Sequence, residues 1–335
     1  MRIAFFKLED WQKEFVQSDK RLEGHDFLFY DTVLDKDNLP EDASVEAVCV
    51  FVNSMVDKEV LEKLPNLKLV VTRSTGYDHI DLEACTEKGV AVANVPAYGE
   101  NTVAEFAFSL ITALARKIPQ SYHRIREEGS WNLDGLRGFD LKGKTLGVVG
   151  TGRIGKYAIK IANGYGMKVI GFDAFPNEEM AKELGFEYQP LEDTLKNSDV
   201  VTIHVPYLKE THHLINKDNI GLMKKGAYLV NTSRGAVVET EALFGALKSG
   251  HLGGAGLDVF EEEGPTKDEL TFLVSGNPAE HDLKILLQNH ALIDMPNVIV
   301  TPHNAFNTQE AIERILNTTV EDLKGFIDGK PVNIV

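Results

Sequence analysis

Short apolar runs alternate with polar stretches of helical character along the N-terminal third of the chain. Each run is long enough for one buried strand and too short for a buried helix. Strands that alternate with helices in this way favour a parallel sheet covered on both faces. The pattern predicts a flavodoxin-like domain with strands at residues 2–6, 26–30, 47–52, 67–72 and 90–94. The expected helices between them cover residues 11–18, 57–64 and 81–88.

A longer amphipathic segment follows residue 99. Thr102 and Glu105 have the spacing of a capping box, and apolar residues recur at helical intervals beyond them until Pro119 is expected to end the helix. The polar segment 121–141 comes next and carries Trp131. This arm indicates either a subunit contact or a surface loop that packs on its own domain.

The alternation resumes in the rest of the chain. Strands are expected at residues 145–149, 167–173, 186–188, 199–206, 227–232, 257–260 and 297–301, and helices at 156–165, 178–184 and 239–248. The last helix, at 309–327, is amphipathic and has no sheet after it, so we expect it to cross back and pack on the N-terminal domain.

A glycine-rich turn stands at the centre of this pattern. Gly150, Gly152 and Gly155 form a Gly-x-Gly-x-x-Gly sequence between an apolar run and a helix, and a second apolar run closes on Asp173. This is the arrangement of a dinucleotide-binding unit, in which the helix N-terminus receives the pyrophosphate and the acid accepts from the ribose hydroxyls. Asp173 would repel the 2′-phosphate of NADP, and the next position holds Ala174 in place of an arginine that could bind this phosphate. The predicted cofactor is therefore NAD and not NADP.

The bulk properties narrow the class of protein. The chain has 335 residues, enough for two domains, and a formal charge of −16 that disfavours nucleic acid and anionic membranes as partners. Two cysteines, Cys49 and Cys85, lie in apolar segments without metal-ligand spacing, so neither a metal site nor a disulfide is expected. The N-terminus opens as a strand and no apolar run has the length of a membrane span, which makes the cytoplasm the expected location.

Three ionisable residues, Arg234, Glu263 and His303, follow strands in the second half. Parallel strands all end at one edge, so these residues and the glycine turn are expected at the same edge. Reduction of a 2-keto acid needs a cation for its carboxylate, which suits Arg234, and a proton donor, which suits His303. Glu263 would orient the imidazole and favour its protonated form. Taken singly, each residue has an ordinary alternative interpretation. Arg234 could be a surface arginine at the start of a helix, Glu263 part of an exposed acidic run, and His303 a cap for the last helix.

An ordered series of motifs runs through the chain. It comprises Arg73-Ser-Thr-Gly-Tyr-Asp-His-Ile80, Asn94-Val-Pro-Ala-Tyr98, Thr102-Val-Ala-Glu105, Gly150–Gly155 with Asp173, His204-Val-Pro206, Met223-Lys-Lys-Gly-Ala-Tyr-Leu-Val-Asn-Thr-Ser-Arg-Gly235, Leu257-Asp-Val-Phe260 with Glu263, and Thr301-Pro-His303. In this series the sequence resembles the D-isomer-specific 2-hydroxyacid dehydrogenases, most of all their D-lactate dehydrogenase branch, over essentially its whole length.

The resemblance implies roles for individual residues. The family's catalytic arginine, histidine and glutamate fall on Arg234, His303 and Glu263, although Glu261 and Glu262 are close rivals for the last on sequence alone. The implied cofactor-binding residues are Gly150, Gly152, Arg153, Ile154, Gly155, Asp173, His204, Val205, Pro206, Thr232, Ser233 and Asp258. Among these, Asp258 and the Thr232 backbone would hold the nicotinamide carboxamide, and residues 204–206 would flank the adenine. The implied substrate-binding residues are Thr75 and Gly76, through their N–H groups, with Tyr98, Arg234 and Phe306.

The resemblance also implies an architecture. It is an α/β protein of two doubly wound parallel-sheet domains: a Rossmann NAD-binding domain of residues 100–303 and a flavodoxin-like substrate domain of residues 1–99 and 304–335. The active site is expected in the cleft between them, and the resemblance implies a homodimer. The pattern along the chain itself indicates the crossings between the domains near 98–101 and 303–306, which are expected to act as hinges.

The implied reaction is reduction of pyruvate to D-lactate by NADH, with His303 as proton donor. Alternatives are a bulkier 2-keto acid, glyoxylate or hydroxypyruvate as substrate, an NAD-sensing corepressor-like binding protein, and a formate or phosphite dehydrogenase. The sequence departs from the lactate branch in the length of residues 263–289. That stretch is expected to be a surface excursion or a lid that alters substrate choice.

Overall fold

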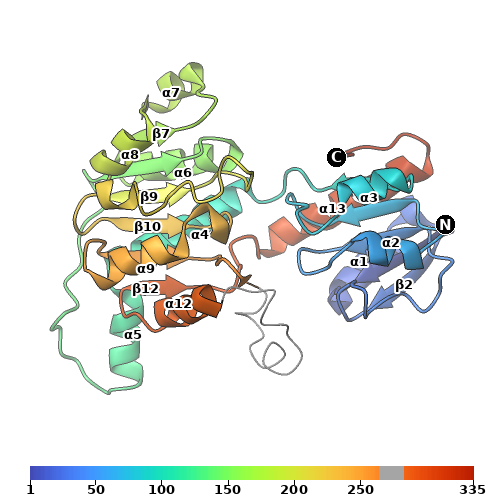
Figure 1. The fold of residues 1–335 in the computed structure, drawn as a ribbon, viewed down its shortest axis with the longest axis horizontal. Helices are drawn as coiled ribbons and strands as arrows, with labels where there is room; N and C mark the ends of the chain where they lie inside the picture. Colours follow the sequence, from blue (N-terminus) through green and yellow to red (C-terminus); the bar gives the residue numbers. More distant parts are fainter. Residues whose placement is uncertain (264–282) are drawn as a thin grey trace. The chain divides into compact units, whose positions relative to one another are not determined.

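The computed structural model describes residues 1–263 and 283–335. The chain divides into two compact units (Figure 1). The first unit contains Met1–Tyr98 and Thr308–Val335, and the second contains Gly99–Asn307. Both contain a sheet whose strands are all parallel, which confirms the predicted fold class.

The first unit is built on a five-stranded sheet in the order β2-β1-β3-β4-β5. Its strands are β1 (Arg2–Phe6), β2 (Asp26–Tyr30), β3 (Ala47–Val50), β4 (Leu69–Thr72) and β5 (Ala91–Asn94). Its helices are α1 (Asp10–Ser18), the 3₁₀ turn η1 (Lys20–Leu22), α2 (Lys58–Lys63), α3 (Leu82–Glu87) and α13 (Gln309–Ile327). All five predicted strands are present. Strands β1, β3, β4 and β5 are mostly buried, as expected for a parallel sheet with both faces covered, whereas the edge strand β2 is partly exposed.

Alternate residues of these strands supply two separate cores. Val48, Val50 and Val70 pack in one cluster with the apolar side chains of α2 and α3. Cys49, Leu69 and Val71 pack in another cluster with the apolar side chains of α13. Because successive side chains of a strand point to opposite faces, helices cover both faces of the sheet. The last helix therefore packs on the N-terminal sheet, although it is the most distant helix in sequence.

The C-terminal tail differs from the sequence-based expectation that no further strand follows the last helix. Ile334 forms an antiparallel bridge with Ala93 at the edge of β5, and the Val335 N–H donates to the Val92 carbonyl at 3.0 Å. Isolated tail residues of this kind carry too weak a pattern to be recognised as a strand partner. The tail covers part of the exposed hydrogen-bonding edge of β5.

The second unit contains a seven-stranded sheet in the order β12-β11-β10-β9-β6-β7-β8. Its strands are β6 (Thr145–Val149), β7 (Lys168–Phe172), β8 (Glu187–Tyr188), β9 (Val200–Ile203), β10 (Tyr228–Asn231), β11 (Gly254–Leu257) and β12 (Val298–Val300). Its helices are α4 (Glu100–Ala115), α5 (Ile118–Arg126), α6 (Arg153–Gly164), α7 (Glu178–Leu184), α8 (Leu191–Asn197), α9 (Thr240–Lys248) and α12 (Leu283–Ile293), with 3₁₀ turns η2 (Ile220–Leu222) and η3 (Gly235–Val237).

Helices cover both faces of this sheet as well. Leu229 of β10 packs in a cluster with the apolar residues of α9, and its neighbour Val230 packs in a cluster with those of α4 and α6. Figure 1 shows α9 and α4 on opposite sides of β10. The strand order reverses between β6 and β9, so the crevice beside β6 is the place where a doubly wound sheet binds its ligand.

Three element boundaries correct the sequence-based predictions. Helix α4 begins at Glu100 after Gly99, so Thr102 lies inside the first turn and does not cap the helix. Pro119 does not end that helix, which stops at Ala115, but stands in the first turn of α5, where its missing N–H has no helical partner to lose. Strand β11 covers Gly254–Leu257, whereas the sequence predicted residues 257–260.

Candidate active site

The glycine turn has the geometry that a pyrophosphate site requires. Gly150 has φ of +92°, and a Cβ there would lie 2.8 Å from the backbone of His204 and Val205. A Cβ on Gly155 would lie 2.1 Å from the Gly150 carbonyl oxygen, whereas a Cβ on Gly152 would meet no atom within 4 Å. Two glycines therefore allow close packing within the protein, and the third leaves open space in front of the α6 N-terminus. The residues fit the phosphates of NAD.

Asp173 is tied to this turn through Thr151. Its Oδ2 accepts hydrogen bonds from the Thr151 N–H at 2.7 Å and the Thr151 hydroxyl at 3.0 Å, and its Oδ1 accepts from the Phe175 N–H at 2.9 Å. The Thr151 hydroxyl also lies 2.8 Å from the Tyr188 hydroxyl. A carboxylate has about four acceptor sites, so Asp173 retains capacity for a ribose hydroxyl. Sequence reasoning missed Thr151 and Tyr188, and only the position of Thr151 inside the motif signals its role.

The segment after β9 reaches the same turn. The His204 N–H donates to the Val149 carbonyl at 2.7 Å, and His204 Nε2 lies 3.0 Å from the Thr202 hydroxyl. Burial lowers the pKa of His204 to about 4, so the ring is neutral at pH 7. His204 therefore offers hydrogen bonding and packing at the glycine turn, and not a positive charge.

The loop after β10 carries Arg234. Asn231 holds this loop from below, because its Oδ1 accepts from the Ser233 N–H and hydroxyl at 3.0 and 2.8 Å and its Nδ2 donates to the Arg234 carbonyl at 2.9 Å. A Cβ on Gly235 would lie 1.9 Å from the Phe260 carbonyl carbon, so the loops after β10 and β11 are in direct backbone contact. Asn231 is a site-supporting residue that the sequence-based prediction did not include.

His303 and Glu263 are in hydrogen-bonding contact, which is the pairing predicted from the sequence. His303 Nδ1 lies 3.0 Å from Glu263 Oε2 and 3.2 Å from Oε1, and both side chains are about one quarter exposed or less, at 20% and 27%. A carboxylate can only accept, so it requires the proton on Nδ1. Within residues 1–263 and 283–335, no hydrogen bond to Nε2 is found, which leaves this nitrogen as the atom able to exchange a proton with a ligand.

Asp258 anchors the loop that carries His303. Its carboxylate accepts from the Thr301 hydroxyl, from the Asn304 N–H at 2.8 Å and from the Ala305 N–H at 2.8 Å, and its backbone carbonyl accepts from the His303 N–H at 2.9 Å. Burial raises the pKa of Asp258, and these hydrogen bonds oppose that effect. The contacts give Asp258 a structural role in addition to the predicted contact with the nicotinamide carboxamide, which stays a prediction.

The geometry distinguishes the three consecutive glutamates. Glu261 is buried, and its carboxylate lies 2.6 Å from His213 Nε2 and accepts from the Thr240 N–H at 2.9 Å. Glu262 has φ of +51°, which turns the chain so that Glu261 and Glu263 contact different partners. Glu263 is the one of the three that contacts His303.

The remaining predicted residues divide between the two units. Thr75, Gly76 and Tyr98 belong to the first unit, whereas Phe306 belongs to the second. Thr75 is exposed and Gly76 is partly exposed, and both directly follow the carboxyl end of β4. Tyr98 and Phe306 are partly buried, and the Tyr98 carbonyl accepts from Arg314 Nε.

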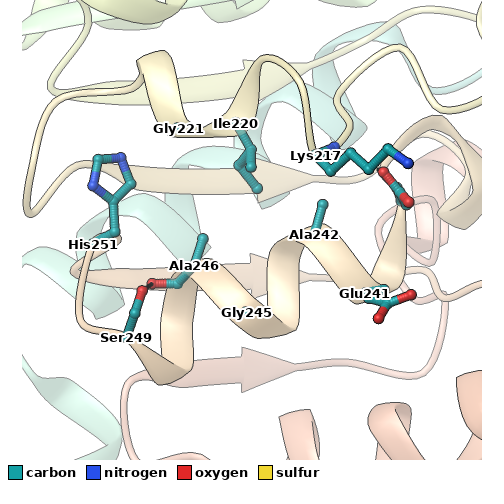
Figure 2. A pocket seen from close by; sticks show the side chains of 10 residues that line it. Lys217, Ile220, Gly221, Glu241, Ala242, Gly245, Ala246, Ser249 and His251 are labelled. Carbon is teal, nitrogen blue, oxygen red and sulfur yellow. Dashed lines mark hydrogen bonds between the residues drawn. The ribbon is translucent and has the colours of Figure 1, made fainter.

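A surface cavity of about 510 Å³ lies elsewhere on the second unit. It runs along α9, between Lys217 and His251 at its two ends, and small residues such as Ala242 and Gly245 form its floor (Figure 2). None of the residues predicted from the sequence as site residues lines it. Among the described residues, no group of three His, Cys, Asp or Glu side chains is arranged to hold a metal ion, and no helix is long and apolar enough to cross a membrane. The predicted stretch 263–289 lies mostly outside the described residues.

Comparison with known proteins agrees with this arrangement. A family model for the NAD-binding domain of D-isomer-specific 2-hydroxyacid dehydrogenases matches residues 108–305. D-lactate dehydrogenase of Escherichia coli is 36% identical over 334 residues, which cover 98% of each chain. Glyoxylate reductase of Thermococcus litoralis is 40% identical over 298 residues, covering 87% of this chain and 83% of that protein.

A solved structure shows the same fold. D-lactate dehydrogenase of Aquifex aeolicus, in complex with NAD and lactic acid, is 38% identical and superposes with a TM-score of 0.83 over 98% of this chain and 96% of that chain. The family model, the identity over nearly the whole chain and the geometry of the glycine turn all agree. The chain belongs to the D-isomer-specific 2-hydroxyacid dehydrogenases and is an NAD-dependent oxidoreductase that acts on CH–OH donors.

Proposed function

We propose that the protein reduces a small 2-keto acid with NADH, and that pyruvate, which yields D-lactate, is its preferred substrate. The main support is the His303–Glu263 pair, which leaves Nε2 available at the sheet edge that also carries Arg234 and the glycine turn. The identity of 36% to a D-lactate dehydrogenase over nearly the whole chain supports the choice of pyruvate.

His303 is the proposed proton donor. Bound NADH supplies a hydride to C2 of the keto acid. The protonated His303 gives its Nε2 proton to the keto oxygen, and Nδ1 keeps its hydrogen bond to Glu263, so the ring does not rotate during the transfer. The products are the 2-hydroxy acid, NAD⁺ and neutral His303, which takes a proton from solvent before the next turnover.

Arg234 is the proposed carboxylate ligand. Its planar guanidinium can bind a carboxylate through two parallel hydrogen bonds, which fixes the orientation of C2 as well as supplying charge. Asn231 and the close contact at Gly235 hold the arginine's backbone in place. The family resemblance assigns the N–H groups of Thr75 and Gly76 to the same carboxylate, which gives the first unit the role of substrate domain.

Glyoxylate is the second candidate substrate, because a glyoxylate reductase is 40% identical over 298 residues. A steady-state screen separates the candidates. Purified protein is assayed with NADH and with NADPH against pyruvate, glyoxylate, hydroxypyruvate and a branched 2-keto acid, and the product enantiomer is identified by chiral chromatography. We expect the highest kcat/KM with pyruvate and NADH and a D-configured product. A higher kcat/KM with glyoxylate or hydroxypyruvate would contradict the choice of pyruvate, and L-lactate would contradict the proposed stereochemistry.

A further inference from the structure

Three consecutive carbonyl groups in the loop after β4 accept hydrogen bonds from the protein. The Ser74 carbonyl accepts from the Val95 N–H at 3.0 Å, and the Thr75 carbonyl accepts from Asn94 Nδ2 at 2.8 Å. The Gly76 carbonyl accepts from the Ser74 hydroxyl at 2.6 Å. Three consecutive carbonyls are therefore bonded to the protein, two of them by side chains.

These contacts determine where the next three N–H groups point. No peptide bond in the chain is cis, and in a trans peptide the C=O and the N–H point in opposite directions. The N–H groups of Thr75, Gly76 and Tyr77 therefore point away from the groups that hold the carbonyls. None of the three has an acceptor in the described part of the chain. Neighbouring backbone N–H groups that have no acceptor in the protein can donate to one bound anion.

A buried relay holds the Ser74 hydroxyl in position. Thr72 Oγ1 lies 2.7 Å from Ser74 Oγ and 3.1 Å from His79 Nε2, and all three side chains are less than a tenth exposed. Ser74 has one hydroxyl proton, which it donates to Gly76, so Thr72 must donate to Ser74. Thr72 then accepts from His79, which requires the proton of that ring on Nε2.

We propose that Ser74 and Asn94 are positioning residues, which hold the N–H groups of Thr75, Gly76 and Tyr77 as three donors to the substrate carboxylate. The inference rests on the proposed function for the identity of the anion. Beyond the two N–H groups assigned by resemblance, it adds the Tyr77 N–H as a third donor. It also gives a role to the polar side chains of Ser74 and Asn94, which do not take part in the proposed hydride or proton transfer.

Binding without turnover tests the three-donor site directly. Oxamate, an unreactive analogue of pyruvate, is titrated into the ¹⁵N-labelled protein saturated with NADH, and the backbone amide resonances of Gly76 and Tyr77 are followed. We expect both to shift and saturate, and the Kd for oxamate to rise about tenfold in Ser74→Ala, as expected for one lost hydrogen bond. Ser54→Ala is the matched control, because Ser54 is also a buried serine of the first unit that accepts a backbone N–H, from Leu34 at 3.2 Å. Its Kd should stay within about twofold of wild type.

Asn94→Ala provides an independent variant if Ser74→Ala does not fold, as judged by circular dichroism. It should raise KM for the keto acid about tenfold while kcat and the KM for NADH change less than about threefold. An unchanged oxamate Kd in folded Ser74→Ala or Asn94→Ala, or amide resonances of Gly76 and Tyr77 that do not respond, would overturn the proposal. Failure of the proposed reaction looks different: wild-type protein would then bind oxamate at these amides but reduce no 2-keto acid.

Discussion

His303 has a backbone conformation that is unfavourable for the stability of the fold, and the position of its side chain explains why it is present. Its φ of +54° lies in the left-handed region, which costs a non-glycine residue about 1–3 kcal/mol. The Asp258 carboxylate offsets this cost by accepting two backbone N–H groups directly after His303. The turn directs the imidazole toward Glu263, which comes from the neighbouring loop.

The charge of Glu263 should matter for rate. Glu263→Gln keeps an acceptor for Nδ1 but removes the negative charge that stabilises the protonated ring, so we expect kcat for keto-acid reduction to fall about 10–100-fold with little change in KM for NADH. Steady-state kinetics at saturating NADH provide the measurement. Glu262→Gln is the matched control and should keep kcat within about threefold, because the structure shows Glu263 in the contact with His303. Equal losses in the two variants would indicate a general effect of the acidic run.

The sequence predicted that His303 and Glu263 form a pair. It did not show the structural difference between Glu263 and its neighbours Glu261 and Glu262. Three adjacent glutamates have the same composition and nearly the same position in any pattern. Their difference arises from the left-handed Glu262 and from the partners His213 and Thr240, which belong to distant segments. Supporting residues such as Asn231 and Tyr188 escaped prediction for the same reason, because their role depends on contacts and not on spacing.

At the scale of elements, strands were more predictable than the ends of helices. The runs that form β1 and β2 match the observed bounds, because a short apolar run suffices to predict a strand. The start of α4 and the break before α5 depend on local backbone geometry, including a left-handed Lys117 that the sequence does not signal. Strand β11 is rich in glycine, which lacks the hydrophobic pattern used to recognise a strand, and small residues are needed there because Gly254 and Gly256 face nearby atoms.

Helix α13 carries a buried acid that should make the stability of the first unit depend on pH. Burial raises the pKa of Asp322 to about 7, the charge of Glu321 adds to this effect, and a hydrogen bond from Asn333 Nδ2 at 2.7 Å opposes it. An unfolded aspartate titrates near pH 4. The folded chain therefore binds this proton more strongly, so the contribution of Asp322 is fully present below about pH 4 and is lost as pH rises through about 7.

Asp322→Asn removes this titration but keeps an oxygen for Asn333. The variant should gain stability relative to wild type as pH rises, and the difference between pH 5 and pH 8 should be on the order of 2 kcal/mol. Urea unfolding at the two pH values, followed by circular dichroism, measures it. Asp328→Asn at the end of the same helix is the control, because Asp328 is half-exposed and pairs with Lys324. If the free energy of unfolding depends on pH equally in the wild type and in Asp322→Asn, the raised pKa of Asp322 is contradicted.

At the scale of the whole molecule, local cations must overcome an acidic background. The formal charge of −16 repels a small anion at long range, and physiological salt screens most of that repulsion beyond about 8 Å. In the proposed function, recognition of a 2-keto acid would therefore depend on short-range groups, for which Arg234, His303 and the N–H groups that follow β4 are the proposed candidates. This explains why the net charge disfavours nucleic acid and anionic membranes as partners but gives no information on the substrate.

The arm of the second unit carries exposed apolar side chains. Ile118, Tyr122 and Ile125 follow one face of α5 at helical spacing and are 55%, 60% and 47% exposed, and Trp131 beyond the helix is 82% exposed. Large apolar side chains grouped on an otherwise polar segment are typical of protein–protein interfaces. The sequence predicted a homodimer from family resemblance, and this α5 patch is the surface we expect it to use.

If the protein is the expected homodimer and uses the α5 patch, charge placed in this patch should separate the subunits. In the double variant Tyr122→Glu with Ile125→Glu, each dimer would bury four unpaired carboxylates, so we expect the dissociation constant to rise at least about 100-fold. Sedimentation equilibrium at micromolar concentration gives the mass of each species, and Trp131 fluorescence should shift to longer wavelength as its surroundings become aqueous. Leu287→Glu is the control, because Leu287 is 71% exposed on α12, outside the patch, and its variant should keep the wild-type mass. If the double variant and the wild type have the same mass, the α5 patch is not the dimer interface, and Trp131 must be exposed for another reason.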